Sequence, residues 1–184
     1  MAIAVVGTVD GGREIYARGA ATAQHGVFVR QEQQTLRFEL IRPEALPRAV
    51  VAVLPAARPG PGQSVMITQP AAAPPARHRF DDDMDQGFAA PVRSARSSSD
   101  AQLQAAERIL RQPRKGGGYF VVTGLDPRGK AIQAPGLSWI DTAEGRYLVQ
   151  STVGEDGQHR GTFAPADEAR LVRQLGDLLR SLGG

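Results

Sequence analysis

The sequence predicts an α+β fold in which two units, each a β-meander closed by a helix, form a pseudo-two-fold molecule around one central antiparallel sheet. One observation is the order of elements, because several short strands followed by a helix are predicted in residues 3–54 and again in residues 117–182. A second is the match of His25–Gln31 to Glu144–Gln150, since both follow a small turn and end in Gln. Only two copies are visible, so the pattern indicates a domain-scale duplication and not a solenoid.

The first half is expected to span residues 1–69 and to begin directly in a strand, without the helix that precedes the second meander. Asp10-Gly11-Gly12 is a strong hairpin signal, and Pro43 stands at a favoured helix start. The expected strands are Ile3–Val9, Arg13–Ala20, Val27–Arg30, Thr35–Leu40 and Ser64–Thr68, with a helix from Pro43 to Pro55.

Residues 70–99 are rich in Pro, Ala and Ser and are expected to link the two halves. The acidic run Asp81–Asp85 lies in this stretch. It lacks the alternate acids and the central glycine of a calcium-binding loop, so it is interpreted as solvated and not as a metal site.

The second half is expected over residues 100–184, where Ser99 and Asp100 offer a helix N-cap. Gly116–Gly118 is expected to lead into the first strand, and Pro135-Gly136 to form a bulge or an edge position. The expected helices are 103–110 and 165–182, and the expected strands are Tyr119–Leu125, Ala131–Ile140, Arg146–Thr152 and His159–Phe163.

Period-two alternation in the strands predicts which side chains pack the sheet. The expected contributors are Leu36, Phe38, Val121, Trp139, Tyr147 and Leu148. The last helix carries a leucine stripe that needs a surface to cover, so it is expected to be structural; the stripe is Leu171, Leu175, Leu178 and Leu182.

Composition excludes several classes of function. The chain has no cysteine, which rules out disulfides and thiol chemistry. The net charge is only +3, and the arginines alternate with acids and alanines, so a nucleic-acid surface is not expected. No stretch reaches the roughly 20 apolar residues that cross a bilayer, and the N-terminus lacks the pattern of a signal peptide. A cytoplasmic protein without membrane or nucleic-acid partners is predicted.

Few residues offer chemistry. His25 and His159 could form an acid–base pair across the pseudo-two-fold axis, or could simply be exposed beside turns. Asp141 and Glu144 could be paired carboxylates, although a turn accounts for them equally well. Neither Asp10-Gly11-Gly12 nor Gly116–Gly118 has the spacing of a phosphate-binding loop. No catalytic residue, metal ligand or cofactor is predicted.

The stretch from Leu137 to Val149, with Asp141-Thr142 and Gly145-Arg146 between two apolar strands, resembles the EspG family of type VII (ESX) secretion chaperones. Gly161–Pro165 and the terminal helix are similar to that family's Thr-Phe-x-Pro segment and last helix. The hairpin at Gly12–Glu14, the strand from His25 and the stretch from Gly60 to Val65 resemble its middle region.

The resemblance implies a cytosolic, non-enzymatic chaperone that binds the apolar tip of PE–PPE type helical substrates, here without the family's N-terminal helical segment. It places the contact surface on the loop joining the second and third strands and on the exposed face of the second-half sheet, with Gln24, His25, Tyr119 and Val121 as partner-binding residues. The alternative is a small-molecule-binding or hydrolytic protein that uses the groove between the halves. The oligomeric state, monomer or dimer, is left open.

Overall fold

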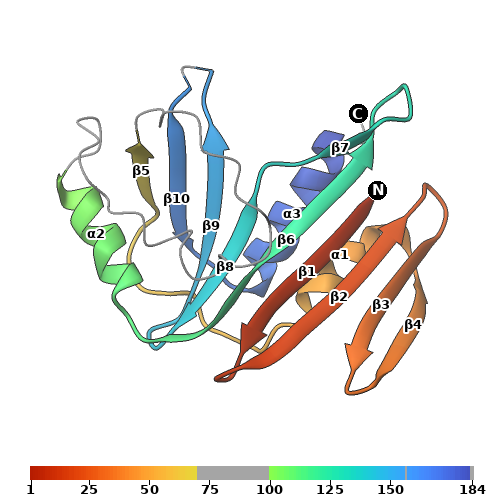
Figure 1. Ribbon diagram of the computed structural model, residues 1–184, viewed down its shortest axis with the longest axis horizontal. Helices are drawn as coiled ribbons and strands as arrows, with labels where there is room; N and C mark the ends of the chain where they lie inside the picture. Colours follow the sequence, from red (N-terminus) through yellow and green to blue (C-terminus); the bar gives the residue numbers. More distant parts are fainter. Residues whose placement is uncertain (70–99, 156, 183–184) are drawn as a thin grey trace.

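The computed structural model describes residues 1–69, 100–155 and 157–182, and within these residues ten strands form one sheet accompanied by three α-helices (Figure 1). The first half supplies β1 (Ala2–Val9), β2 (Arg13–Ala21), β3 (Gly26–Glu32), β4 (Thr35–Ile41), a 3₁₀ turn (Pro43–Ala45), α1 (Leu46–Val51) and β5 (Val65–Gln69). The second half supplies α2 (Asp100–Leu110), β6 (Arg114–Leu125), β7 (Ala131–Gln133), β8 (Leu137–Thr142), β9 (Arg146–Val153), β10 (His159–Pro165) and α3 (Glu168–Leu182). The linker predicted at 70–99 lies outside the described residues, so the domain boundaries stay a prediction.

The strands follow the order β4-β3-β2-β1-β6-β8-β9-β10-β5, and β7 pairs with β6 beside this path. All of these pairs are antiparallel. The predicted central antiparallel sheet built from both halves is therefore confirmed, with β4 at one end and β5 at the other.

The pseudo-two-fold axis passes between β1 and β6. Val5 pairs with Phe120, and on either side Ala4 pairs with Val121 while Val6 pairs with Tyr119. From this centre β1, β2, β3 and β4 correspond to β6, β8, β9 and β10, and α1 corresponds to α3. The duplication seen in the sequence is thus a real symmetry of the fold.

The two turns that precede β3 and β9 carry the same hydrogen bonds. In the first, Thr22 Oγ1 accepts from the backbone N–H of His25 at 3.1 Å and the Thr22 N–H donates to the His25 carbonyl at 2.8 Å. In the second, Thr142 Oγ1 accepts from the Gly145 N–H at 3.2 Å and the Thr142 N–H donates to the Gly145 carbonyl at 3.0 Å. Thr22 is therefore the counterpart of Thr142.

This turn corrects the predicted alignment of the repeats by one residue. The prediction matched His25 with Glu144 and so Phe28 with Tyr147. In the structure Phe28 corresponds to Leu148, and both are buried in the same core cluster. A shift of one residue exchanges the two faces of a strand, so the shared glycine that suggested the alignment is coincidental.

One face of the sheet is covered by α1 and α3, which lie behind it in Figure 1. Leu46 and Val50 of α1 and Leu171 and Leu175 of α3 are fully buried there, in one cluster with residues of both halves such as Val5. Leu178 is buried and Leu182 packs against the same cluster. The prediction that the terminal helix is structural is confirmed.

Gly116–Gly118, predicted to lead into the first strand of the second half, lie inside that strand, β6. Trp139 accounts for Gly118 and for its cross-strand neighbour Gly7, because the indole ring occupies the space above both. A Cβ on Gly118 would come within 2.4 Å of the ring, and one on Gly7 within 2.7 Å. The predicted strand Ala131–Ile140 is in fact two strands, β7 and β8, separated at Pro135-Gly136.

Candidate partner-binding surface

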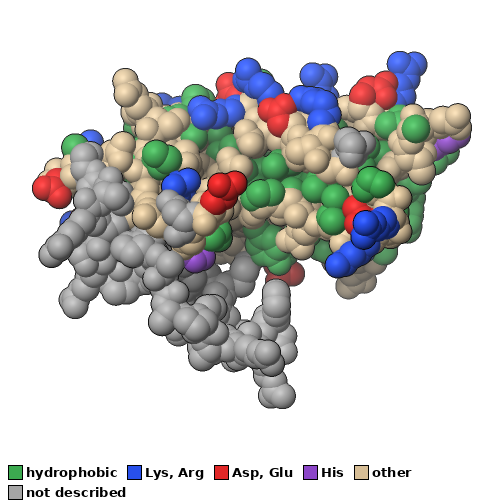
Figure 2. Space-filling model, turned by 90° about the horizontal axis from the view of Figure 1, so that it is seen from above, with side chains coloured by type: hydrophobic (Ala, Val, Ile, Leu, Met, Phe, Trp, Pro, Cys, Tyr) green, Lys and Arg blue, Asp and Glu red, His purple; other side chains and the backbone are tan. Residues whose placement is uncertain are grey.

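Among the residues that the structure describes, the face of the sheet opposite α1 and α3 is covered in the second half and uncovered in the first. We call the uncovered part, carried by β1–β4 and β6, the open face. Cross-strand pairing assigns its side chains, because directly paired residues point to the same side. The larger apolar members are Val6, Tyr16, Val27, Val29, Leu36, Phe38, Leu40, Tyr119 and Val121. Figure 2 views the molecule from above and shows hydrophobic side chains at the surface among charged ones.

The outermost strand of the open face carries its most exposed apolar residues. Leu36, Phe38 and Leu40 of β4 expose 56%, 67% and 86% of their surface. The prediction that Leu36 and Phe38 pack the sheet is therefore wrong. Their period-two pattern is correct, but β4 ends the sheet and no described helix lies over this side. Trp139, Tyr147 and Leu148 are buried as predicted, and Val121 is half-buried.

The second half shows how the equivalent surface is covered. Val29 pairs with Phe38, and its counterpart Val149 pairs with Phe163, so Phe38 and Phe163 occupy equivalent positions. Phe163 is only 3% exposed. It pairs with Val65 of β5 and belongs to a buried cluster with Ala106 and Ile109 of α2. A strand and an amphipathic helix thus cover in one half what stays bare in the other.

Tyr119 and Val121, two of the predicted partner-binding residues, lie on the open face. They are in β6 at the centre of the sheet, beside Val6 and Ala4. The partner-binding surface was predicted on the exposed face of the second-half sheet. In the second half, however, α2 covers β5, and the uncovered part of this face lies in the first half (Figure 1).

Gln24 and His25 lie in the turn between β2 and β3, and both are exposed. The turn stands roughly 7 Å beyond Val27 along β3, at the end of the open face, from the rise per strand residue. Across the sheet it lies roughly 25 Å from Tyr119, from three interstrand spacings and about six residues of strand rise. The four predicted residues therefore do not form one cluster, but they border the same surface.

Tyr16, Leu36, Phe38 and Leu40 were not predicted as surface residues, although together they supply most of the exposed apolar area on the open face. A signal for them existed in the sequence. That signal is the period-two alternation of Leu36, Phe38 and Leu40, which places the three side chains on one face of their strand.

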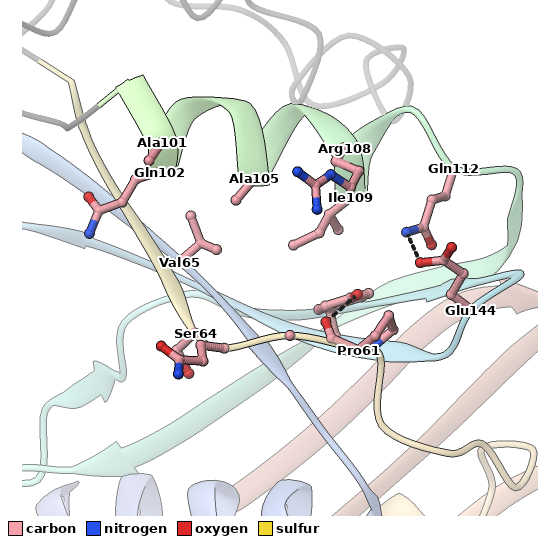
Figure 3. Close-up of a pocket in the computed structure, with 13 residues that line it drawn as sticks. Pro61, Ser64, Val65, Ala101, Gln102, Ala105, Arg108, Ile109, Gln112 and Glu144 are labelled. Carbon is pink, nitrogen blue, oxygen red and sulfur yellow. Dashed lines mark hydrogen bonds between the residues drawn. The ribbon is translucent and has the colours of Figure 1, made fainter.

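A pocket that bears on the alternative function lies under α2, where the segment from Pro61 to Val65 of the first half meets residues of the second half. It measures about 530 Å³ and is lined by α2 residues such as Ala105 and Ile109 and by the segment from Pro61 to Val65 (Figure 3). Gln112 Nε2 donates to Glu144 Oε2 at 2.6 Å at its end.

Tyr147 lies in the wall of this pocket, where its hydroxyl donates to the Pro61 carbonyl at 3.0 Å. Burial raises the pKa of the Tyr147 hydroxyl above its ordinary value; the carboxylate of Glu144 raises it further, and a hydrogen bond with Gln112 lowers it. A phenol held in its neutral form next to a carbonyl acceptor is a structural group, and it supplies no base.

The groups named as candidates for chemistry are not brought together. His25 precedes β3 and His159 begins β10, with five strands of the sheet order between those two. Six interstrand spacings of about 4.8 Å place them roughly 29 Å apart. Asp141 and Glu144 do not form a carboxylate pair, because Asp141 is bound to Arg146 and Glu144 to Gln112.

Asp141 and Arg146 form a buried bidentate ion pair at the start of β9. Arg146 Nε donates to Asp141 Oδ1 at 2.6 Å and Nη2 donates to Oδ2 at 2.8 Å. Nη2 also donates to the Pro55 carbonyl at 2.8 Å, which ties the segment after α1 to the second half. The Asp-Thr…Gly-Arg pattern of the sequence is thus a structural device that closes a turn and anchors a crossing segment.

A sequence model described as the EspG family matches residues 1–177. Among solved structures, the chain is similar to the Mycobacterium tuberculosis type VII secretion system chaperone EspG5 in complex with a PE25–PPE41 dimer. The TM-score is 0.57 at 14% identity, over 98% of this chain and 72% of that one. No curated protein matches the sequence.

Proposed function

The chain belongs to the EspG family, and we propose that it is a type VII secretion chaperone that shields the apolar tip of a PE–PPE type helical substrate. The observation that carries the proposal is the open face. An apolar sheet surface of this kind, uncovered in a folded chain, is the feature that a shielding chaperone requires, because burial of apolar surface supplies the driving force for binding.

The dimensions of the open face suit a helical partner. From β6 to β4 the sheet crosses four interstrand spacings, or roughly 19 Å. A helix with its side chains is about 10–12 Å across, so this width accepts the end of a helical pair. The similarity to a chaperone solved with a PE25–PPE41 dimer supports the same class of partner.

Tyr119 and Val121 are proposed as central contacts and Gln24 and His25 as contacts at the rim. Tyr119 can bury its ring while its hydroxyl stays hydrated, which favours a transient interface. Arg18, exposed between Ala4 and Val29 in the same row, adds a positive charge within an apolar surface and can select a partner with an acidic group beside its apolar tip.

The protein is further proposed to act without catalysis and in the cytoplasm. The separation of His25 from His159 and the occupied carboxylates of Asp141 and Glu144 argue against the hydrolytic alternative. Among the described residues, no helix is long and apolar enough to cross a membrane.

Co-expression with PE–PPE pairs tests the proposal. The tagged chain is expressed with PE–PPE pairs from its source organism and with PE25–PPE41, and co-purification is measured. Each pair is also tested with the apolar residues of its PPE tip replaced by Asp. Capture that disappears with the altered tip supports the proposal. Absence of capture from every pair, or capture that ignores the tip, contradicts it. Hydrolytic turnover abolished by His25→Ala with His159→Ala would favour the alternative.

A further inference from the structure

Strand β4 is an unprotected edge of the sheet. Within the described residues its only strand neighbour is β3, whereas its counterpart β10 has β9 on one side and β5 on the other. The strand β5 runs antiparallel to β10. The fold therefore accepts an antiparallel strand at this position, and an edge that presents unpaired backbone groups with exposed apolar side chains is a template for such pairing.

The sequence of β4 is complementary to itself. Residues 36–40 are Leu-Arg-Phe-Glu-Leu. If two copies pair antiparallel with Phe38 opposite Phe38, each Leu36 stands opposite a Leu40 and each Arg37 opposite a Glu39. The leucines and phenylalanines all fall on the open face, and the charges on the other. Both apolar pairs and opposite charges directly across a strand pair are stabilising.

The charges on this edge lie at the surface. Glu39 Oε1 is 3.1 Å from Arg37 Nε and 3.5 Å from Arg30 Nη2, and the side chains of Arg37 and Glu39 are 58% and 37% exposed. Pairing with a second copy would place a further arginine beside each Glu39 and a further glutamate beside each Arg37. A shift of register by two residues would lose this match, so the charges also fix the register.

We propose that two copies of this chain associate through β4, in an antiparallel strand pair centred on Phe38. The sheets of the two copies become continuous, and their open faces join along one side of the dimer. The contact is isologous, which gives a closed two-fold dimer and not a fibre. This inference does not depend on the proposed function, because it concerns the chain alone.

Charge reversals test the pairing by sedimentation velocity on the full chain. Arg37→Glu sets Glu against Glu39 of the other copy, and Glu39→Arg sets Arg against Arg37, so each single variant is expected to weaken the dimer at least about tenfold. A one-to-one mixture of the two variants restores every opposite-charge pair. The mixture is therefore expected to form a heterodimer, and the double variant Arg37→Glu/Glu39→Arg a homodimer. Arg173→Glu, on α3, is the control.

Several results would overturn the proposal. A wild-type chain that stays monomeric at its highest soluble concentration does so directly. So does a wild-type dimer that both single variants leave intact, since the contact would then lie elsewhere. Monomeric single variants that fail to associate on mixing exclude this register. Circular dichroism establishes that each variant is folded. The proposal is also contradicted if β4 binds an added helical or extended partner and not a second copy of the chain.

Discussion

Val121 of β6 and Phe38 of β4 lie in one cross-strand row on one face of the sheet. Ala4, Arg18 and Val29 stand between them, each paired with the next. Val121 was predicted to bind a partner and Phe38 to pack the sheet. The structure places both side chains on the same face, in one row of paired residues. The open face is therefore continuous from the centre of the sheet at β6 to its edge at β4.

Phe38 and Phe163 are equivalent by symmetry but differ in burial, so the same substitution has different costs. Phe163→Ala is expected to lower the free energy of unfolding by about 3–5 kcal/mol, since it removes a buried ring. Phe38→Ala is expected to change it by no more than about 0.5 kcal/mol, as at an exposed site. Urea denaturation measures both. Equal losses would mean that Phe38 is covered in solution.

The terminal helix is predicted to hold its face of the sheet through leucines that are fully buried. Leu175→Ala should cost about 2–5 kcal/mol of unfolding free energy, since Leu175 lies in the core cluster of both halves. The exposed Arg173→Ala serves as the control on the same helix. A loss near zero for Leu175→Ala would show that this face of α3 is open.

The buried pair of Arg146 and Asp141 gives a third prediction. Asp141→Ala should cost about 3–5 kcal/mol, because it leaves the Arg146 guanidinium buried without its counter-charge. Replacing both residues by apolar ones of similar size, as in Asp141→Leu with Arg146→Met, should recover part of that loss. If the double variant is no more stable than the single one, the pair contributes through its contact with Pro55 and not through charge.

The raised pKa of Tyr147 predicts an alkaline effect with a definite sign. A folded-state pKa above the unfolded one means that the folded chain holds the proton longer, so the contribution is fully present below about pH 10 and is lost as the pH rises through the folded value. Tyr147→Phe should cost about 1 kcal/mol at pH 7 through the lost hydrogen bond. It should also reduce the fall in stability between pH 9 and pH 11, which denaturation at several pH values measures. An equal fall in both proteins would contradict the assignment.

The sequence predicted the repeat, the strand order within each half and the burial of Trp139 because turn signals and period-two alternation are local properties. It did not predict the register of the repeat. The alternation repeats every two residues, and a glycine common to both copies suggested an alignment one residue away from that defined by the Thr22 and Thr142 turns.

Other features could not be predicted because they depend on contacts between distant segments. Alternation in β4 shows that Leu36 and Phe38 share a face, but only the positions of α2 and β5 show that this face is bare. Likewise Gly118 was predicted to precede its strand and not to lie within it, since nothing in the local pattern reveals that the ring of Trp139 lies over it.

The most direct test of the central claim measures which face of the sheet binds a captured PE–PPE dimer. Titration calorimetry is carried out with the wild type and with Tyr119→Ala, Val121→Asp and Met66→Asp, after circular dichroism has shown each variant to be folded. Met66 is the control, because it is 48% exposed but points to the α3 side of the sheet. We predict at least about tenfold weaker binding for Tyr119→Ala and Val121→Asp, and wild-type affinity for Met66→Asp. Unchanged affinity of both open-face variants, or a loss confined to Met66→Asp, would contradict the account.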